Sequence, residues 1–501
     1  MAIFTRLLAL VLALVVLAGQ PAAVSAAERS QQEQRTGPLV VRYVGADDPA
    51  SQAEFVWYAA AVKQAYRDVQ DVFGSAIQQT GTPERTEIVV TLYGDDAAYG
   101  RANPVAGREE GVLGHAQPAE GIIGMAVARL RDKSESFRRD AIRHELTHIV
   151  LGDLSRQRLP IGFQEGIAQY LERDLDQRQR FATAVRRGRD AGQLLKIQDL
   201  NRQRPFLAAA SLAYPQSYTF TVFLAERYGF GKVIQLVTAT RDAETLDAAV
   251  RTVFERPLAD LEAEWLDFLP AFLDTGWARN DLDLWDLAEP RRLLGDGKYA
   301  EARDLYGRAE ALFTSVGRMD RVAEAATERQ RAVVALEAAD LSQRGMAALV
   351  GTDYAAAAEL LAGARQRWQA AGDTRRAELS LLGLTQAQDG QAAVTQLADA
   401  RAQLDGWHFQ VADDLAYEAG QTLAELGDGP RTEEARQIMR DAQDLRTRMG
   451  IAAAGGGVAG VGVLGVGWLV GRSRRRARPA APAPGSPGAP GVAVMERDWS
   501  L

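Results

Sequence analysis

The 501-residue chain contains no cysteine. This excludes disulfide frameworks, thiolate zinc sites and cysteine nucleophiles, so any metal must be held by histidine and carboxylate side chains. Histidine is scarce as well, with four residues in the whole chain. A basic excess is also missing, because 66 acidic residues outnumber 58 basic ones and the net charge is -8. The chain therefore lacks the charge typical of a protein that binds nucleic acid.

Two apolar runs lie near the two ends of the chain. Residues 1–27 combine an early arginine, an apolar core and small residues before Glu28, which is typical of a secretory signal peptide, cleaved or retained as an anchor. Ile451–Val470 has 20 residues without a charge, enough for a transmembrane helix, although its glycines leave a soluble linker as the alternative. Five arginines between 472 and 478 follow this run, and such clusters stay on the cytoplasmic side. We expect a single-pass cell-membrane protein with residues 28–450 outside and a disordered cytoplasmic tail, 472–501, rich in Pro, Ala and Gly.

The region from residue 39 to 275 mixes strand and helix patterns, with 47% apolar residues in the chain as a whole. Short β-rich runs come first and helical periodicity follows, which predicts an α+β domain. The predicted strands are Leu39–Tyr43, Ile88–Leu92 and a pair within Gly111–Val127, and the predicted helices are Ala53–Phe73 and one that runs from Phe137 to Gly152.

The second of these helices carries the motif HExxH, formed by His144, Glu145 and His148. Residues four apart share one helical face, so both imidazoles can bind one Zn²⁺. Glu145 lies next to the first histidine and can take a proton from the water that such an ion activates. The motif therefore predicts a zinc hydrolase site.

A catalytic zinc site needs a third protein ligand, and the next helical segment, Ile161–Glu172, offers two carboxylates. Glu165 lies 17 residues beyond His148 and is the preferred ligand, with Glu172 as its rival. The two carboxylates are two helical turns apart, so we expect only one of them to face the metal.

At these residues the chain resembles the gluzincin zinc metallopeptidases of the MA clan, particularly bacterial peptidase MA-like domains. The resemblance implies a thermolysin-like domain with His144, His148 and Glu165 as ligands and Glu145 as general base. It also implies a small sheet whose edge strand pairs with an extended peptide, and Gly121–Val127 is the candidate edge. One departure concerns the residue four positions after the third ligand, where thermolysin-like enzymes have an Asp that orients the first histidine and this chain has Gln169.

The resemblance further implies a tyrosine that stabilises the oxyanion, and Tyr214 or Tyr218 could serve. A packing role is the alternative for either ring. The remaining histidines are His115, which lies in the predicted strand pair and could touch substrate, and His408, which lies too far along the chain to be a credible ligand.

Residues 286–448 are rich in helix formers and predict an all-helical domain. Six positions recur at an offset of 55: Tyr299, Ala302, Leu305, Ala309, Phe313 and Gly317 match Tyr354, Ala357, Leu360, Ala364, Trp368 and Gly372. This pattern indicates tetratricopeptide-like helical hairpins. Since the offset exceeds the usual tetratricopeptide period, we expect extra helices within each unit.

Two classes of function follow from these patterns. The first is a membrane-anchored, extracytoplasmic zinc endopeptidase that acts on peptide or protein substrates. The second is an inactive surface protein that binds a protein partner through its helical repeats. A binding protein would have no chemical need for Glu145, which is not a ligand, so the motif favours the enzyme.

Overall fold

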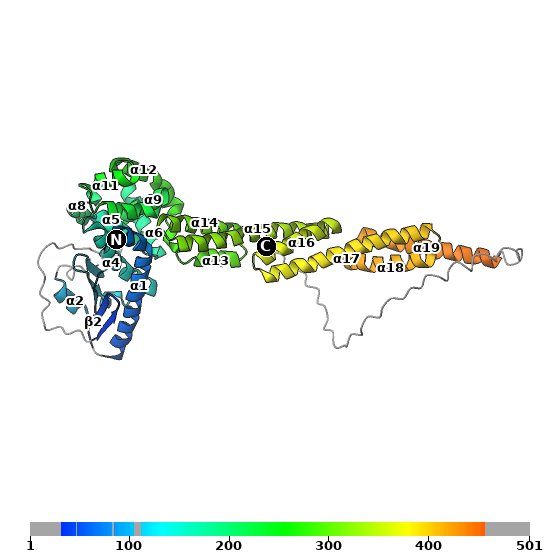
Figure 1. Ribbon diagram of the computed structural model, residues 1–501, viewed down its shortest axis with the longest axis horizontal. Helices are drawn as coiled ribbons and strands as arrows, with labels where there is room; N and C mark the ends of the chain where they lie inside the picture. Colours follow the sequence, from blue (N-terminus) through cyan, green and yellow to red (C-terminus); the bar gives the residue numbers. More distant parts are fainter. Residues whose placement is uncertain (1–31, 47, 83–84, 105–111, 456–501) are drawn as a thin grey trace, which may run out of the picture. The chain divides into compact units, whose positions relative to one another are not determined.

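A computed structural model describes residues 32–46, 48–82, 85–104 and 112–455 (Figure 1). The predicted signal segment 1–27, the tail 472–501 and all but the first five residues of the apolar run 451–470 lie outside the described residues. Among the helices that are described, none is both long enough and apolar enough to cross a membrane.

Contacts divide the chain into two compact units: Met1–Leu293 with Glu301–Arg329, and Leu294–Ala300 with Gln330–Leu501. The first unit thus extends past the boundary near residues 275–286 that composition indicates. The reason is a set of contacts made by residues 313–318. Ser315 Oγ accepts a hydrogen bond of 3.2 Å from the backbone of Gly231, and Arg318 forms an ion pair of 3.2 Å with Asp71.

The first unit contains a five-stranded sheet in the order β1-β2-β3-β5-β4. The strands are β1 (Gln32–Thr36), β2 (Leu39–Val44), β3 (Ile88–Tyr93), β4 (Gly114–Gln117) and β5 (Ile122–Ala126). The central strands β2, β3 and β5 are parallel, whereas β1 and β4 are antiparallel to their neighbours. The predicted strand pair is therefore confirmed, but the prediction that Gly121–Val127 forms the sheet edge is wrong. β5 is bonded on both sides, and β4 is the edge strand.

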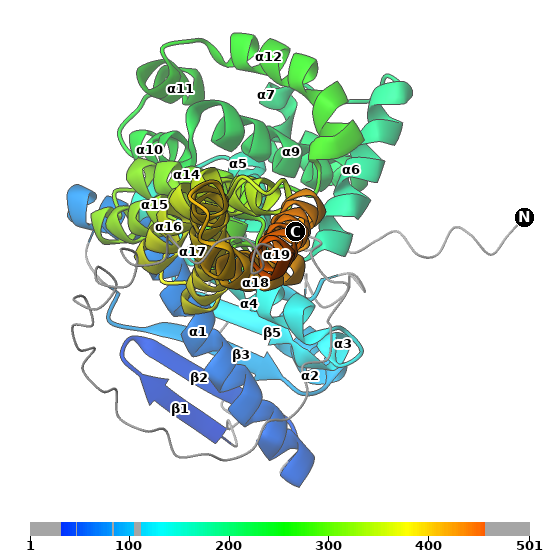
Figure 2. The same ribbon diagram turned by 90° about the vertical axis from the view of Figure 1, so that its right-hand side faces the viewer.

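The strand β3 is central because its sequence, IVVTLY, is apolar on both faces, as strands of buried parallel sheets are. Two long helices, α1 (Pro49–Thr80) and α4 (Glu135–Ser155), pack against each other and contact the sheet (Figure 2). Asp48 caps the start of α1 through a bond to the backbone of Ser51, and Gly81 ends the helix with a φ of +59°. The sheet and the helix α4 together support the site.

The helix α4 begins at its cap Ser134 and ends at Ser155, not at Gly152. Gly152 serves close packing instead, since a Cβ atom there would lie 2.6 Å from the side chain of Pro118. This allows the turn between β4 and β5 to approach the helix. The same turn is held by Arg85, which binds the backbone of Pro118 and forms an ion pair of 2.6 Å with Asp153.

The rest of the first unit is mostly helical. Its shorter helices are α2 (Asp96–Ala102), α3 (Val127–Leu130), α5 (Ile161–Tyr170), α6 (Leu175–Asp190), α7 (Ile197–Leu200), α8 (Gln203–Ala208), α9 (Ala210–Tyr228), α10 (Phe230–Ala239), α11 (Leu246–Phe254), α12 (Leu258–Ala271) and α13 (Ala288–Gly295), with the π-helix η2 (Phe272–Gly276) and the 3₁₀-helix η3 (Asp281–Leu284). The segment Ile161–Glu172 is helical to Tyr170, as the pattern predicts, and Glu172 lies just beyond the helix end.

The C-terminal region consists of three helical hairpins, and the all-helical prediction is confirmed. The first helices are α14 (Tyr299–Ser315), α16 (Tyr354–Ala370) and α18 (Phe409–Glu425), and the second are α15 (Met319–Val350), α17 (Thr374–Asp405) and α19 (Gly429–Gly455). Each pair starts 55 residues after the one before. The expected extra helices are wrong, because the second helix of each of the first two pairs is a single helix of 32 residues.

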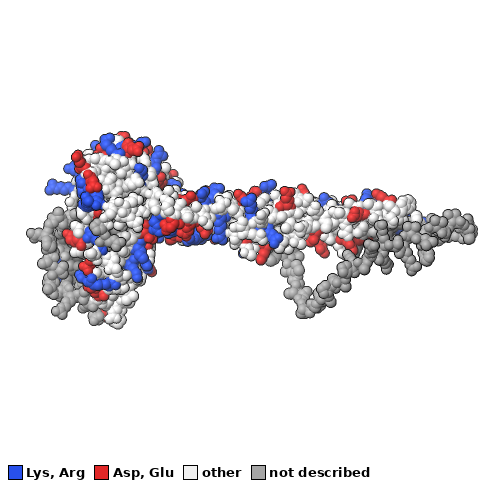
Figure 3. Space-filling view, viewed as in Figure 1, with Lys and Arg blue, Asp and Glu red and all other residues white. Residues whose placement is uncertain are grey.

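The third hairpin also carries the six repeated positions, with Phe409, Ala412, Leu415, Ala419, Leu423 and Gly427. Gly317, Gly372 and Gly427 close the first helix of each pair with φ of +77°, +75° and +77°, a conformation that favours glycine. In the second unit, the guanidinium of Arg376 lies 5.4 Å from the ring of Trp368. Acidic and basic side chains are intermixed on the face shown in Figure 3.

Candidate metal centre

His144 and His148 project from the same face of α4 and are 1% exposed. Glu165 reaches them from α5, and its side chain is 0% exposed. The helix α5 can lie deep in the unit because Gly166 faces α9 without a side chain. A Cβ atom at Gly166 would lie 2.4 Å from Thr221 Oγ1. Two adjacent helices thus bring the HExxH histidines and the third predicted ligand together.

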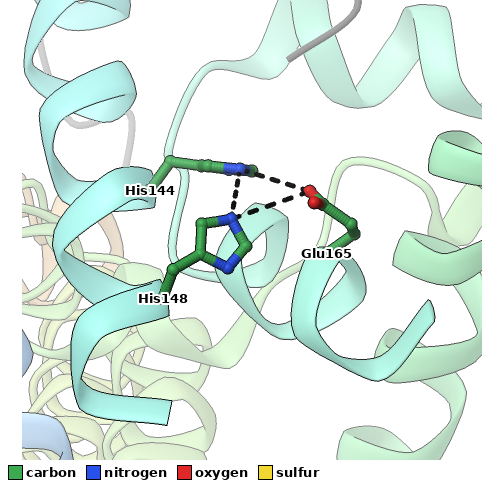
Figure 4. A group of neighbouring side chains, drawn as sticks. All are labelled: His144, His148 and Glu165. Atoms are coloured by element: carbon green, nitrogen blue, oxygen red, sulfur yellow. Dashed lines mark hydrogen bonds and ion pairs between the residues drawn. The ribbon is translucent and has the colours of Figure 1, made fainter. Parts of the chain in front are cut away.

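The three side chains face one another in a compact triangle (Figure 4). The Nε2 atoms of His144 and His148 are 3.0 Å apart, and Glu165 Oε2 lies 3.3 Å from the first and 3.8 Å from the second. For Zn²⁺ with bonds near 2.0 Å, tetrahedral geometry places neighbouring ligand atoms roughly 3.3 Å apart. The triangle therefore has the size of one face of a zinc coordination tetrahedron.

The hydrogen bonding of these side chains also fits a cation. Within the described residues, both carboxylate oxygens of Glu165 and Nδ1 of His148 are buried without a hydrogen-bond partner. Buried carboxylates without partners are costly, whereas a divalent cation would satisfy them. No other group of three such side chains among the described residues has this geometry. The donor set, two imidazoles and one carboxylate, is one that catalytic zinc sites use.

Burial and mutual contacts shift the pKa values within the cluster. Burial alone would lower the pKa of His144, but its contacts with Glu165 and Glu172 outweigh burial and raise that pKa. Burial lowers the pKa of His148, and the neighbouring His144 lowers it further. Burial raises the pKa of Glu165, opposed by its contact with His144. The cluster is a tightly coupled set of buried groups, as functional sites often are.

Glu145 lies beside the triangle and belongs to no ion pair among the described residues. Burial raises its pKa to about 8, with His144 opposing the shift and the carboxylates of Glu165 and Glu172 adding to it. Its Oε2 atom is buried without a hydrogen-bond partner. A cation on the three ligands would favour the ionised form of this carboxylate. Glu145 is thus placed as a proton acceptor next to the centre, not as a member of it.

Glu172 has a different place from the one expected for a rival ligand. Its Oε1 atom lies 2.8 Å from Nδ1 of His144, on the side of the ring opposite to Nε2. The amide oxygen of Gln169, the residue at the position that orients the first histidine in thermolysin-like enzymes, is buried without a hydrogen-bond partner in the described structure. Sequence reasoning missed this arrangement, because the chain turns after Tyr170 and the helical pattern does not show where Glu172 points.

The two candidate tyrosines lie on α9 in different surroundings. Tyr214 lines a cavity of about 560 Å³ formed by the start of α4 and by α6 and α9, and its ring contacts Phe206. Tyr218 is fully buried, its ring lies 5.4 Å from that of Phe181, and burial raises the pKa of its phenol. Phe137 also lines this cavity, seven residues before His144 and thus about 10 Å from it along the same helical face.

The other two histidines lie apart from the triangle. His115 is on β4, where its Nδ1 atom shares a hydrogen bond of 3.0 Å with the hydroxyl of Tyr99, and it is buried. His408 is exposed and caps the start of α18. The structure therefore groups two of the four histidines with Glu165.

Together, the mixed sheet, the HExxH helix and the adjacent glutamate helix define a peptidase-like domain. Residues 72–271 match the family model of the Peptidase MA superfamily, so this part of the chain is a peptidase MA-like domain. No curated protein and no solved structure matches the chain significantly. The family match includes the whole triangle but ends before η2, whereas the first compact unit continues to Arg329.

Proposed function

We propose that the chain is a zinc-dependent endopeptidase of the gluzincin type. The observation that supports this most directly is the buried triangle of His144, His148 and Glu165, with Glu145 beside it and outside the ligand set. When bound there, Zn²⁺ would act as a Lewis acid toward a peptide carbonyl and an attacking water. Glu145 would take the proton of that water and pass it to the leaving amine.

The edge strand β4 is the proposed binding surface for the substrate backbone. Ala126 donates to the carbonyl of Leu113, so the backbone groups of Gly114 and Ala116 point away from β5, toward the free edge. An extended peptide can add to such an edge as a further strand. Between the two candidate tyrosines, Tyr214 is the preferred oxyanion donor because it lines a cavity, whereas Tyr218 is fully buried.

Metal analysis paired with peptide hydrolysis tests the proposal. Purified protein should hold about one zinc per chain and hydrolyse an unstructured peptide, and a chelator should abolish hydrolysis. Glu145→Gln should keep the zinc and lower kcat by roughly 10²–10⁴-fold, the usual contribution of a general base. Glu165→Ala should lose the zinc. Zinc binding without any hydrolysis would instead support the alternative, an inactive binding protein.

We further propose that the peptidase domain lies outside the cytoplasm, anchored by residues 451–470 with a cytoplasmic C-terminus. The support is the sequence alone, namely the signal-like segment 1–27 and the arginines after Val470. The helical hairpins would then act as a spacer from the membrane or as a surface for a protein partner. Protease added to intact cells should remove the domain and spare an epitope on the tail. Digestion of that epitope in intact cells would contradict this topology.

A further inference from the structure

The link between α5 and α6 carries Glu172 to the far side of His144. Both side chains are buried, and the 2.8 Å contact joins Glu172 Oε1 to His144 Nδ1. Since a carboxylate accepts this bond, the ring nitrogen Nδ1 carries the proton. Nε2 is then left with its lone pair directed at Glu165 and His148. One contact thus determines both the tautomer and the orientation of the first predicted ligand.

The backbone on the C-terminal side of Glu172 is held by α4 itself. Asp140 lies one helical turn before His144, and its Oδ2 atom accepts hydrogen bonds of 2.8 Å and 2.9 Å from the backbone of Arg173 and Asp174. Burial raises the pKa of Asp140, opposed by its contacts with Arg143 and with these two amides. The helix that carries the histidines therefore also holds the link that carries Glu172.

The other support comes from residues 278–283, which follow the part of the chain matched by the family model. Arg178 is 2% exposed, and it donates a hydrogen bond of 3.0 Å to the backbone oxygen of Glu172. Asp283 holds the guanidinium of Arg178 through two contacts, of 2.6 Å and 2.8 Å. Asn280 donates a bond of 2.7 Å to the backbone oxygen of Tyr170. Both ends of the link are thus tied to this later segment.

We propose that Glu172 is the positioning residue for His144, in place of Gln169, and that Asp283 and Asn280 maintain its position through the link. The proposal rests on the proposed function, because it concerns the same zinc site. A carboxylate that accepts from a ligand imidazole raises the basicity of the ring and fixes its direction. An amide at Gln169 could supply only a weaker acceptor, and its oxygen makes no hydrogen bond in the described structure.

Zinc affinity, measured on the full-length protein by competition with a chromophoric chelator, tests the first part. Glu172→Leu removes the acceptor and should weaken zinc binding by roughly 10–100-fold, the usual effect of losing such a partner. Glu172→Gln keeps an acceptor, should partly restore the affinity and guards against misfolding of the leucine variant. Gln169→Leu is the matched control and should bind zinc like the wild type. The absorption bands of bound Co²⁺ should shift with the Glu172 variants and not with the control.

The second part is tested by Asp283→Asn, with Asp281→Asn as its control. Asp281 lies on the same segment but pairs with Arg308 and does not touch the link. Asp283→Asn should weaken zinc binding, whereas Asp281→Asn should not. A loss of thermal stability in the metal-free protein without a change in zinc affinity would show a merely structural role and overturn this part.

The outcomes separate the two proposals. If the wild type binds zinc and both Glu172 variants bind it equally well, the positioning role is wrong and the proposed function stands. If the folded wild type binds no zinc, the proposed function is overturned, and the positioning role falls with it. An equal loss of affinity in Gln169→Leu and Glu172→Leu would also overturn the assignment of Glu172.

Discussion

Gly114 of the edge strand lies directly against the carboxylate of Glu145. A Cβ atom at Gly114 would lie 2.9 Å from Glu145 Oε1 and 3.1 Å from its Cγ atom, closer than a side chain can approach. Glycine at this position lets the proposed general base and the free strand edge share one narrow space. The backbone that would bind the substrate and the group that would take its proton are therefore in direct contact.

This contact predicts the effect of Gly114→Ala. The added methyl group must displace the Glu145 side chain, and misplacing a catalytic group by about 1 Å can reduce the rate roughly 100-fold. Peptide hydrolysis should therefore fall, while zinc content stays at the wild-type level because no ligand is touched. Gly100→Ala is the control, since nothing lies within 4 Å of the methyl group it adds. Wild-type turnover by Gly114→Ala would contradict the role of this contact.

A second glycine governs how deeply α5 is inserted. At Gly166 a methyl group would lie 2.4 Å from Thr221 Oγ1 and 2.5 Å from the backbone oxygen of Ser217. Overpacking of this kind typically costs about 1–3 kcal/mol, so Gly166→Ala should lower the free energy of unfolding by that amount and weaken zinc binding through Glu165. Gly74→Ala in α1 meets nothing within 4 Å and should stabilise the helix by up to about 1 kcal/mol. Equal stability of the two variants in urea unfolding would disprove this account.

The sequence predicted those parts of the molecule that depend on local periodicity. The strands β2 and β3, the HExxH helix and the 55-residue repeat follow from patterns of period two, near four, and fixed offset. The pairing order of the sheet did not follow, because β4 and β5 are both short and their order depends on which strand meets β3. Similarly, Gly152 looked like a helix terminator because its close contact with Pro118 is tertiary.

The candidate site shows the same limit. The histidines and Glu165 were predictable because helical spacing places them, but Glu172 lies beyond the end of α5, where no periodicity applies. Its position depends on bonds to Asp140, 32 residues earlier, and on Arg178 and Asp283. A turn held by long-range hydrogen bonds cannot be derived from local sequence. The third hairpin was missed for a simpler reason, since Phe409 and Leu423 replace the aromatic residues Tyr354 and Trp368.

The extent of the first unit predicts how it can be truncated. A fragment that ends at residue 285 contains every proposed ligand but lacks Phe313, which is 0% exposed and packs edge-on against Trp285 at 5.3 Å. Burying a phenylalanine contributes roughly 1.5–3 kcal/mol, so residues 32–285 should be less stable than residues 32–329 by at least that amount. Thermal unfolding of the two fragments, with zinc removed, measures the difference. Equal melting temperatures would show that residues 301–329 are dispensable for this unit.

The last prediction concerns the pH dependence of stability and rests on His115, whose side chain is 5% exposed. Burial lowers its pKa from 6.5 to about 4. Between these values the unfolded chain takes up a proton that the folded chain refuses, so stability falls as the pH falls below 6.5 and stops changing below pH 4. This single group should remove about 2 kcal/mol of stability between pH 7.5 and 5. His115→Gln cannot take up that proton, so the difference in free energy of urea unfolding between wild type and variant should shrink by the same amount over this range. His408→Gln changes an exposed histidine and should follow the wild type at every pH. A constant difference between wild type and His115→Gln would mean that His115 is protonated as readily in the folded protein as in the unfolded chain, and that its hydrogen bond to Tyr99 does not require the neutral ring.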